Sequence, residues 1–357
     1  MIKLLHAADL HLDSPITGRS DAQAGYLRRA LGSVPGMLAD LCRKEKCNLA
    51  VLSGDIFDAP PSSATVRCLK QALEEMAVPV FIAPGNHDPF TTGCVWDREI
   101  WPDNVTVFRQ QTPVRIPLPQ LDCEIYGAAF QGMDCPGLLE NFRAKGQYKH
   151  RIGVFHGDPS HAVSPYNPIT APQVRDSWLS YLALGHIHKA GSFRAGDTLC
   201  AWPGCPMGRG FDEPGEKGVI LVTLDEKVSA RFVPLDTPRF YDLDARVEDD
   251  AAKALEKVLP PAGNHHFYRV TLTGSCEPLD LRTLDDSFPQ FPNLELRDRT
   301  YAHRDPWENA GEDTLEGMFF RKLRDAMEGQ SGEECRRIAL AAKLARQILD
   351  GQEVALP

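Results

Sequence analysis

The 357-residue sequence has no excess of basic charge. Its 39 Lys and Arg residues are outnumbered by 49 Asp and Glu residues, which gives a formal net charge of −10. Proteins that bind nucleic acid unaided usually carry a basic surface. Any contact with a phosphate backbone therefore needs a local patch, a bound metal or a partner. The charge balance argues against tight independent DNA binding without excluding a nuclease.

Paired cysteines and long apolar runs are also missing. The ten cysteines include no C-x-x-C pair, which favours free thiols in a reducing cytosol over a disulfide framework. Cys200 and Cys205 come nearest to a metal-binding pair, but the residues between them indicate a turn. The apolar run at Ile2–Ala7 is too short for a signal peptide or a membrane span. We therefore expect a cytoplasmic protein without a membrane segment.

Short apolar runs alternate with helical patterns in the N-terminal half. The runs predicted to be buried strands are Ile2–Ala7, Leu49–Leu52, Val80–Ala83, Ile152–Phe155 and Tyr181–Leu184. Ala24–Lys44 and Ser63–Met76 have helical spacing. This alternation predicts an α/β fold, a layered sandwich of sheets flanked by helices. Leu69, Leu73 and Met76 would serve equally in the core or in a homodimer interface.

The remaining chain predicts further elements and two more segments. Antiparallel strands are expected near Val105–Phe108, Val114–Ile116 and Cys123–Tyr126, and a strand pair at Gly218–Leu224 and Ser229–Pro234. The catalytic domain is predicted to cover residues 1–236, and an α+β capping domain residues 237–305. The capping domain is expected to contain a helix at Asp249–Leu259 and strands at Phe267–Thr273 and Leu294–Arg299. Residues 306–357 predict two amphipathic helices that pack on their own core or dock on a partner.

Each of the five apolar strands is followed by residues that bind divalent cations. In order along the chain these are Asp9 and His11, then Asp55, then Asn86, His87 and Asp88, then His156, and finally His186 and His188. In α/β layers, ligands collect outside the carboxyl ends of the strands. We therefore expect these side chains to converge on one rim.

The donor chemistry predicts two metal ions. Carboxylate and amide oxygens with imidazole nitrogens, and no thiolate, suit manganese, iron or zinc-type ions. Seven donors are too many for one ion, and suit two ions about 3.5–4 Å apart that share a bridging carboxylate. A lone His156 after an apolar strand would more often be a core histidine. All the motifs in order make coincidence a poor explanation.

The ordered motifs D-x-H, G-D-x-x-D, G-N-H-D, H and G-H-x-H resemble those of the calcineurin-like metallophosphoesterase superfamily. His6–Asp13, Gly54–Asp58 and Tyr181–Lys189 are similar to the SbcD-type DNA-repair exonucleases, nearest the YhaO-like branch. Leu235–Phe240 and Tyr268–Gly274 support the same branch, so the resemblance covers nearly the whole chain.

The resemblance implies a role for each site residue. One metal would be held by Asp9, His11 and His188, the other by Asn86, His156 and His186, and Asp55 would bridge them. Mn²⁺ is the expected metal, with Fe²⁺ or Zn²⁺ as alternatives. His87 would protonate the leaving oxygen or stabilise the transition state, and Asp88 would orient its imidazole. Some relatives carry a histidine where this chain has Asp58, and the residues around His156 match poorly.

The same resemblance implies a DNA exonuclease or endonuclease that acts on DNA ends in repair. Its partner would be a coiled-coil ATPase of the SbcC or YhaN type, which would also supply a DNA-binding surface. One alternative is a phosphodiesterase or phosphatase for nucleotides and other small substrates, because the ions recognise a phosphoryl group. A further alternative is a catalytically idle subunit that docks the ATPase.

Overall fold

The computed structural model describes residues 1–248, 250–263, 265–301, 305 and 307–349. Its contacts divide the chain into two compact units. The first comprises Met1–Asp242, Gly263–Arg269 and Phe291–Leu294, and the second comprises the segments between and after these. The expected boundaries at 236/237 and 305/306 stay predictions, and residues 306 and 350–357 lie outside the described residues.

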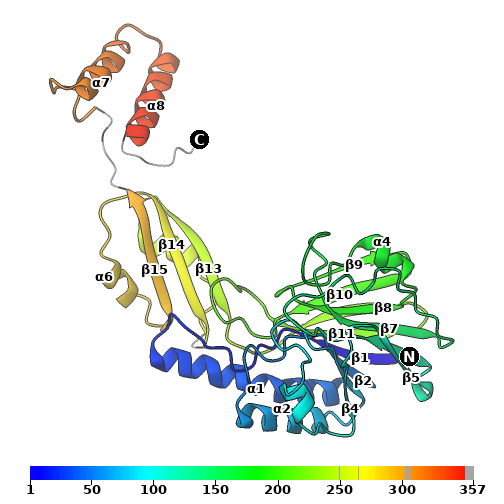
Figure 1. The fold of residues 1–357 in the computed structure, drawn as a ribbon. Coiled ribbons are helices and arrows are strands. Elements are labelled where there is room, and N and C mark those ends of the chain that lie inside the picture. The colour runs from blue at the N-terminus through cyan, green and yellow to red at the C-terminus, as the bar shows by residue number, and fades with distance from the viewer. Residues whose placement is uncertain (249, 264, 302–304, 306, 350–357) are drawn as a thin grey trace. The chain divides into compact units, whose positions relative to one another are not determined.

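The first unit contains two six-stranded sheets (Figure 1). The first sheet has the order β12 (Ser229–Pro234), β11 (Gly218–Leu224), β1 (Ile2–Ala7), β2 (Leu49–Leu52), β3 (Val80–Ile82) and β4 (Val105–Val107). The second has the order β5 (Val114–Leu118), β6 (Cys123–Gly127), β7 (His150–His156), β8 (Tyr181–Gly185), β10 (Thr198–Gly204) and β9 (Lys189–Ala195). Within them, β1, β2 and β3 are parallel, and so are β6, β7 and β8. The expected layered α/β sandwich is confirmed.

Successive residues of a strand point to opposite faces, and this places the cores of the first unit. Leu4 of β1 packs in an apolar cluster with residues of β6, β7 and β8, between the sheets. Leu5 packs in another cluster with α1 (Asp21–Glu45) and α2 (Ser63–Glu75), which cover the outer face of the first sheet (Figure 1). α4 (Ala171–Asp176) lies on the opposite side, next to β9 and β10. The short α3 (Val95–Arg98) and the 3₁₀ turn Pro119–Leu121 complete this unit.

The capping residues of α1 and α2 explain where these helices begin. Ser20 and Ser62 precede them, and each side chain accepts a hydrogen bond from the backbone N–H three residues later. The sequence prediction of both helices is confirmed. Leu69, Leu73 and Met76 are buried in the core, so they do not form an exposed interface. The expectation that the strand at β4 pairs antiparallel is wrong, because β4 pairs parallel with β3.

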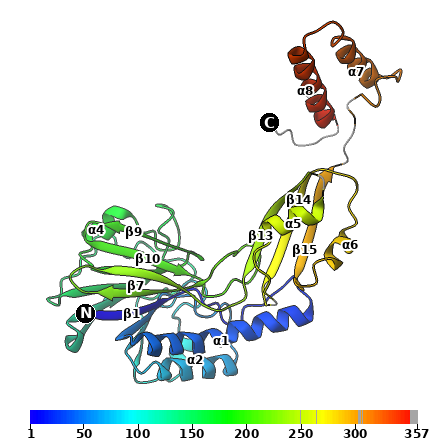
Figure 2. The same ribbon diagram turned by 180° about the vertical axis from the view of Figure 1, so that it is seen from behind.

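The later part of the chain contains a three-stranded sheet and four helices within the described residues (Figure 2). The elements are β13 (Phe240–Val247), α5 (Ala251–Val258), β14 (Phe267–Ser275), α6 (Leu281–Asp286), β15 (Leu294–Tyr301), α7 (Leu315–Asp325) and α8 (Gly332–Leu349). The predicted start of α5 at Asp249 lies outside the described residues. α7 and α8 share a small core of Phe320 and Ala342 with Ala310. Among the described helices, none has the length and hydropathy needed to cross a lipid bilayer.

Candidate metal centre

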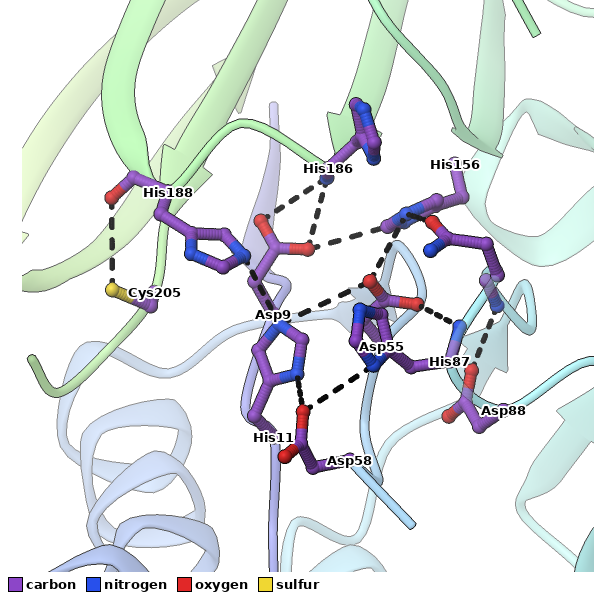
Figure 3. A network of polar contacts seen from close by, with 12 residues as sticks. Asp9, His11, Asp55, Asp58, His87, Asp88, His156, His186, His188 and Cys205 are labelled. Atoms are coloured by element: carbon purple, nitrogen blue, oxygen red, sulfur yellow. Dashed lines mark hydrogen bonds and ion pairs between the residues drawn. The ribbon is translucent and has the colours of Figure 1, made fainter. Parts of the chain in front are cut away.

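The predicted ligands lie in loops at the carboxyl ends of five parallel strands from both sheets (Figure 3). Hydrogen bonds join the loops of one sheet to those of the other. The backbone N–H of His186, after β8, donates to Asp9 Oδ1 at 2.9 Å, after β1. His156 Nδ1, at the end of β7, donates to the carbonyl oxygen of Ser53 at 2.9 Å, after β2. The side chains therefore gather on one rim, as expected, and the structure adds that this rim is assembled from both sheets.

Glycines that precede the ligands allow the loops to approach this closely. A Cβ atom at Gly54 would lie 2.4 Å from His156 Nδ1, and one at Gly85 would lie 2.2 Å from Asp55 Oδ1. At Gly185 it would lie 2.1 Å from the Ser53 carbonyl oxygen. Each distance is shorter than any real Cβ contact, so the glycines of the motifs are required sterically.

Several site residues have a backbone conformation that side-chain-bearing residues rarely adopt. Asp9, His11 and Asp55 have φ angles of 52°, 46° and 52°, and His186 has 98°. Such strained residues cluster at functional sites, where surrounding contacts hold them.

One group of candidate ligands consists of Asp9, His11 and His188. His11 Nε2 and His188 Nε2 lie 3.0 Å apart. This separation would let both nitrogens bind one ion. His11 Nδ1 donates to Asp58 Oδ1 at 2.8 Å, and His188 Nδ1 donates to Glu213 Oε1 at 2.6 Å. Because carboxylates only accept, Nε2 of each neutral imidazole carries the lone pair.

The second group consists of Asp9, Asp55 and His156, and Asn86 joins it through His156. His156 Nε2 lies 3.0 Å from Asn86 Oδ1 and 3.3 Å from Asp55 Oδ2. Since His156 Nδ1 donates to a carbonyl, its Nε2 is the nitrogen that would bind a metal ion once it loses its proton. Nε2 and the two oxygens point at one another, so a divalent cation would take the place of this proton between them. The donor set and its arrangement therefore fit divalent cations.

The buried charges of the site perturb one another strongly. Burial raises the pKa of Asp9, and the Asp55 carboxylate adds to this rise. Burial alone would lower the pKa of His156, but the charges of Asp55 and Asp9 raise it to about 9. The hydrogen bond from His11 holds the pKa of Asp58 at about 2. Asp9 and Asp55 thus disfavour each other's ionised form, and a bound cation would relieve this repulsion.

His87 differs from the ligands in its exposure. Its side chain is 40% exposed, whereas that of His11 is 1% exposed. The backbone N–H of His87 donates to Asp55 Oδ1 at 3.0 Å, and its Nδ1 lies 3.3 Å from Asp58 Oδ1. The imidazole is thus next to the metal ligands and accessible to a substrate.

Asp88 does not lie where the expected pairing with His87 needs it. Its Oδ1 accepts from the backbone N–H of Gly85 at 2.8 Å, and its Oδ2 accepts from those of Ile56 and Phe57 at 2.8 and 3.2 Å. A buried carboxylate with these backbone partners holds the two loops together. We therefore correct the expectation: Asp58 is the carboxylate beside the His87 imidazole.

His186 contacts the candidate ligand Asp9 through its backbone N–H, whereas its side chain lies against other rings. Its imidazole contacts the rings of Tyr166 and His156, with centroids 4.9 and 5.3 Å away. The candidate metal groups of the described residues do not include it, and Figure 3 shows the ring directed away from Asp9 and Asp55. Its role as a ligand stays a prediction.

Arg209 and Glu213 were missed by sequence reasoning. Both lie in the loop between β10 and β11, which contains no metal-binding motif. The one available indication was an Arg and a Glu four residues apart in a segment rich in glycine and proline.

Comparison with known proteins agrees with this site. Residues 2–203 match the calcineurin-like phosphoesterase family. The chain is 32% identical over 238 residues to the uncharacterized metallophosphoesterase YhaO of Bacillus subtilis (strain 168), covering 62% of this chain and 57% of that protein. It is 28% identical over 92 residues to the DNA double-strand break repair protein Mre11 of Saccharolobus solfataricus, covering 25% and 23% of the two chains. The matches thus span less than two thirds of either relative.

Solved structures also match. One is a dimetal phosphatase from Danio rerio, with 12% identity, a TM-score of 0.39, and coverage of 64% of this chain and 98% of that one.

Proposed function

Because the chain belongs to the calcineurin-like phosphoesterase family, we propose that it is a two-metal phosphodiester hydrolase that acts on DNA ends. The observation that carries the hydrolase proposal is the convergence of two candidate ligand groups, Asp9–His11–His188 and Asp9–Asp55–His156, whose imidazole nitrogens and carboxylate oxygens lie close to one another. Asp55 would bridge the two ions, a role supported by its Oδ2 lying 3.3 Å from His156 Nε2 and 3.9 Å from His11 Nε2. Mn²⁺ is the expected metal.

Two cations held by these residues would lower the pKa of a bound water molecule and neutralise the charge that develops on the phosphoryl oxygens. The chain itself contributes the positions and a proton. Asp58 orients the His87 imidazole through Nδ1, so Nε2 is the nitrogen that hands a proton to the leaving oxygen. The exposure of His87 lets this nitrogen reach the substrate.

DNA as the substrate rests on the likeness to a protein described as a DNA double-strand break repair protein. The net charge of −10 supports a partner that supplies the DNA-binding surface, for which a coiled-coil ATPase of the SbcC or YhaN type is the proposal. Exposed apolar side chains of α7 and α8, among them Leu315 at 87%, support docking of a partner.

The test is to assay the purified chain with Mn²⁺ on linear duplex DNA, on single-stranded DNA and on a chromogenic phosphodiester, with and without the cognate ATPase. Cleavage of DNA that the ATPase enhances is the expected result. The matched control is Asp55→Ala purified in the same way, because any cleavage that survives it belongs to a contaminating nuclease.

Three outcomes separate the alternatives. Hydrolysis of the chromogenic diester without DNA cleavage, even beside the ATPase, would replace the nuclease by a small-substrate phosphodiesterase. No hydrolysis, no bound transition metal and no rescue by Mn²⁺ would favour a docking subunit. DNA cleavage by the wild type alone would remove the need for the partner.

A further inference from the structure

Arg209 lies next to the candidate metal centre and contacts two carboxylates at once. Its Nη2 donates to Glu213 Oε1 at 2.7 Å, and its Nη1 lies 3.3 Å from Asp58 Oδ1. Its backbone N–H also donates to Glu213 Oε2 at 2.8 Å. The Arg209 side chain is 20% exposed, so these ion pairs are largely shielded from water. A planar guanidinium suits such a bridge, because it presents several donors in fixed directions.

Each of the two carboxylates holds one metal-binding histidine by its Nδ1 atom. Asp58 holds His11 at 2.8 Å, and Glu213 holds His188 at 2.6 Å. The contacts form a closed ring that runs from Arg209 through both carboxylates to the two facing Nε2 atoms, 3.0 Å apart. Carboxylates bonded to ligand imidazoles fix their tautomer and raise their basicity.

We propose that Arg209 and Glu213 are positioning residues that set the tautomer and the spacing of His11 and His188 for one of the two cations. This inference rests on the proposed two-metal function. Without Arg209, Asp58 and Glu213 would lose the cation that neutralises both and the donors that fix their orientation. Asp58 also lies 3.3 Å from His87 Nδ1, so the same ring orients the proton donor.

The ring supports only one of the two cation positions. At the other, His156 Nδ1 donates to the neutral carbonyl of Ser53, and Asn86 supplies an amide oxygen. Arg209 has no contact with His156 or Asn86 among those of the described residues. Loss of the ring is therefore expected to weaken one metal-binding step and to leave the other nearly unchanged.

The experiment titrates the metal-free full chain with Mn²⁺ by calorimetry and compares wild type with Arg209→Met, Arg209→Lys and Glu213→Gln. Outer-sphere substitutions of this kind weaken metal binding about 10- to 100-fold. For Arg209→Met we expect a weakening of this size in one of the two Mn²⁺-binding steps. Arg209→Lys should recover part of it, because lysine keeps the charge but not the fork of donors.

Two further measurements separate positioning from general support of the fold. NMR of histidine side-chain nitrogens should show protonated Nδ1 at His11 and His188 in the wild type and a tautomer mixture in Arg209→Met. The matched control is Arg115→Met, which breaks another ion pair to a buried carboxylate, at 2.8 Å from Glu124 Oε2. It should leave both binding steps and both tautomers unchanged.

The result distinguishes failure of this inference from failure of the proposed function. Wild-type protein that takes up no metal would overturn both. Two ions in the wild type, with unchanged affinities and tautomers in Arg209→Met, would overturn only the positioning role. Equal weakening of both steps in Arg209→Met would also overturn it, because the ring would then support the fold of the whole site.

Discussion

At the scale of single residues, Asp55 and His87 are joined by a backbone hydrogen bond, yet their side chains occupy different environments. Asp55 is buried, and its Oδ2 lies 3.3 Å from His156 Nε2 and 3.9 Å from His11 Nε2, which belong to different ligand groups. His87 contributes its backbone N–H to Asp55 and exposes its ring. Metal retention and proton donation are therefore separable by mutation.

Asp55→Ala is expected to lose bound metal and activity together, because the proposed function has this carboxylate bridge both ions. His87→Ala should keep its metal content and lose turnover by about 10²- to 10⁴-fold, the usual contribution of a general acid. Metal analysis and hydrolysis of a chromogenic diester measure the two effects. Loss of metal from His87→Ala would contradict this separation of roles.

Gly85→Ala tests the steric origin of the motif. The added Cβ would lie 2.2 Å from Asp55 Oδ1 and 2.7 Å from the Asp55 backbone nitrogen, so the carboxylate must move. We expect weaker metal binding by calorimetry. The control is Gly32→Ala in α1, where a Cβ meets nothing within 4 Å and helix propensity favours alanine by about 0.5–1 kcal/mol. Unchanged metal affinity in Gly85→Ala would refute the steric argument.

Sequence motifs predicted which residue types gather at the site but not all of their partners. Asp9, His11, Asp55 and His156 were predictable because each lies at the end of an apolar strand or in the loop that follows it. Arg209 and Glu213 were not, because they lie in an irregular loop whose path depends on contacts distant in sequence. The change of partner from Asp88 to Asp58 has the same cause, since adjacency in sequence does not determine where a side chain points.

At the scale of elements, a buried polar contact joins the two sheets below the site. His6 of β1 faces Tyr181 of β8, whose hydroxyl lies 2.8 Å from His6 Nδ1. His6 Nε2 lies 3.1 Å from the carbonyl oxygen of Leu184. Burial lowers the pKa of His6 to about 3, although the hydrogen bond to Leu184 opposes this shift. His6 is therefore neutral in the folded protein at neutral pH.

This contact predicts a pH dependence of the free energy of unfolding. Unfolded His6 has a pKa of about 6.5, so only the unfolded state gains its proton as pH falls from about 6.5 towards 3. The contribution of neutral His6 to the free energy of unfolding is complete above pH 6.5. Below that pH it falls by up to about 1.4 kcal/mol per pH unit. Urea denaturation with chelator present should show a shallower decline for His6→Gln than for wild type. His161→Gln, at a side chain 75% exposed, is the control. Equal slopes for wild type and His6→Gln would contradict the prediction.

Elements with clear apolar periodicity were predicted nearly to their ends, as β1, β2 and α1 show. β9, β10 and β13 were missed, for different reasons. Glycine and polar residues interrupt β9, and β10 contains Pro203. β13 has the polar–apolar alternation of a strand, so its sequence did carry a signal. The wrong direction of β4 has a different cause. Its sequence fits either pairing, and the partner is selected by burial against β3, which is distant in sequence.

At the scale of the whole molecule, every candidate ligand lies in the first unit. The sequence predicted consecutive domains, but the contacts assign residues 263–269 and 291–294 to the first unit. Local sequence patterns do not reveal that a later segment packs with an earlier unit.

Calorimetric unfolding should therefore show two transitions. Mn²⁺ should raise the midpoint temperature of the first unit's transition and leave that of the other unchanged. A ligand at 100 times its dissociation constant stabilises the folded state by about 2.7 kcal/mol. Asp55→Ala should abolish the shift, and a chelator should reverse it in the wild type. A metal-induced shift of both transitions, or of neither, would contradict the assignment of the metal to this unit.

The left-handed residues after β1 and β2 have a further consequence. Each strained residue costs about 1–3 kcal/mol, and Asp9, His11 and Asp55 all lie in two adjacent loops. Two buried carboxylates, Asp9 and Asp55, add mutual repulsion when no cation is bound. These loops should therefore be the first part of the first unit to open after metal removal, with their amide hydrogens exchanging before those of the strands that precede them. Metal binding would then slow that exchange, because it would stabilise the folded conformation of these loops as well as activate the site.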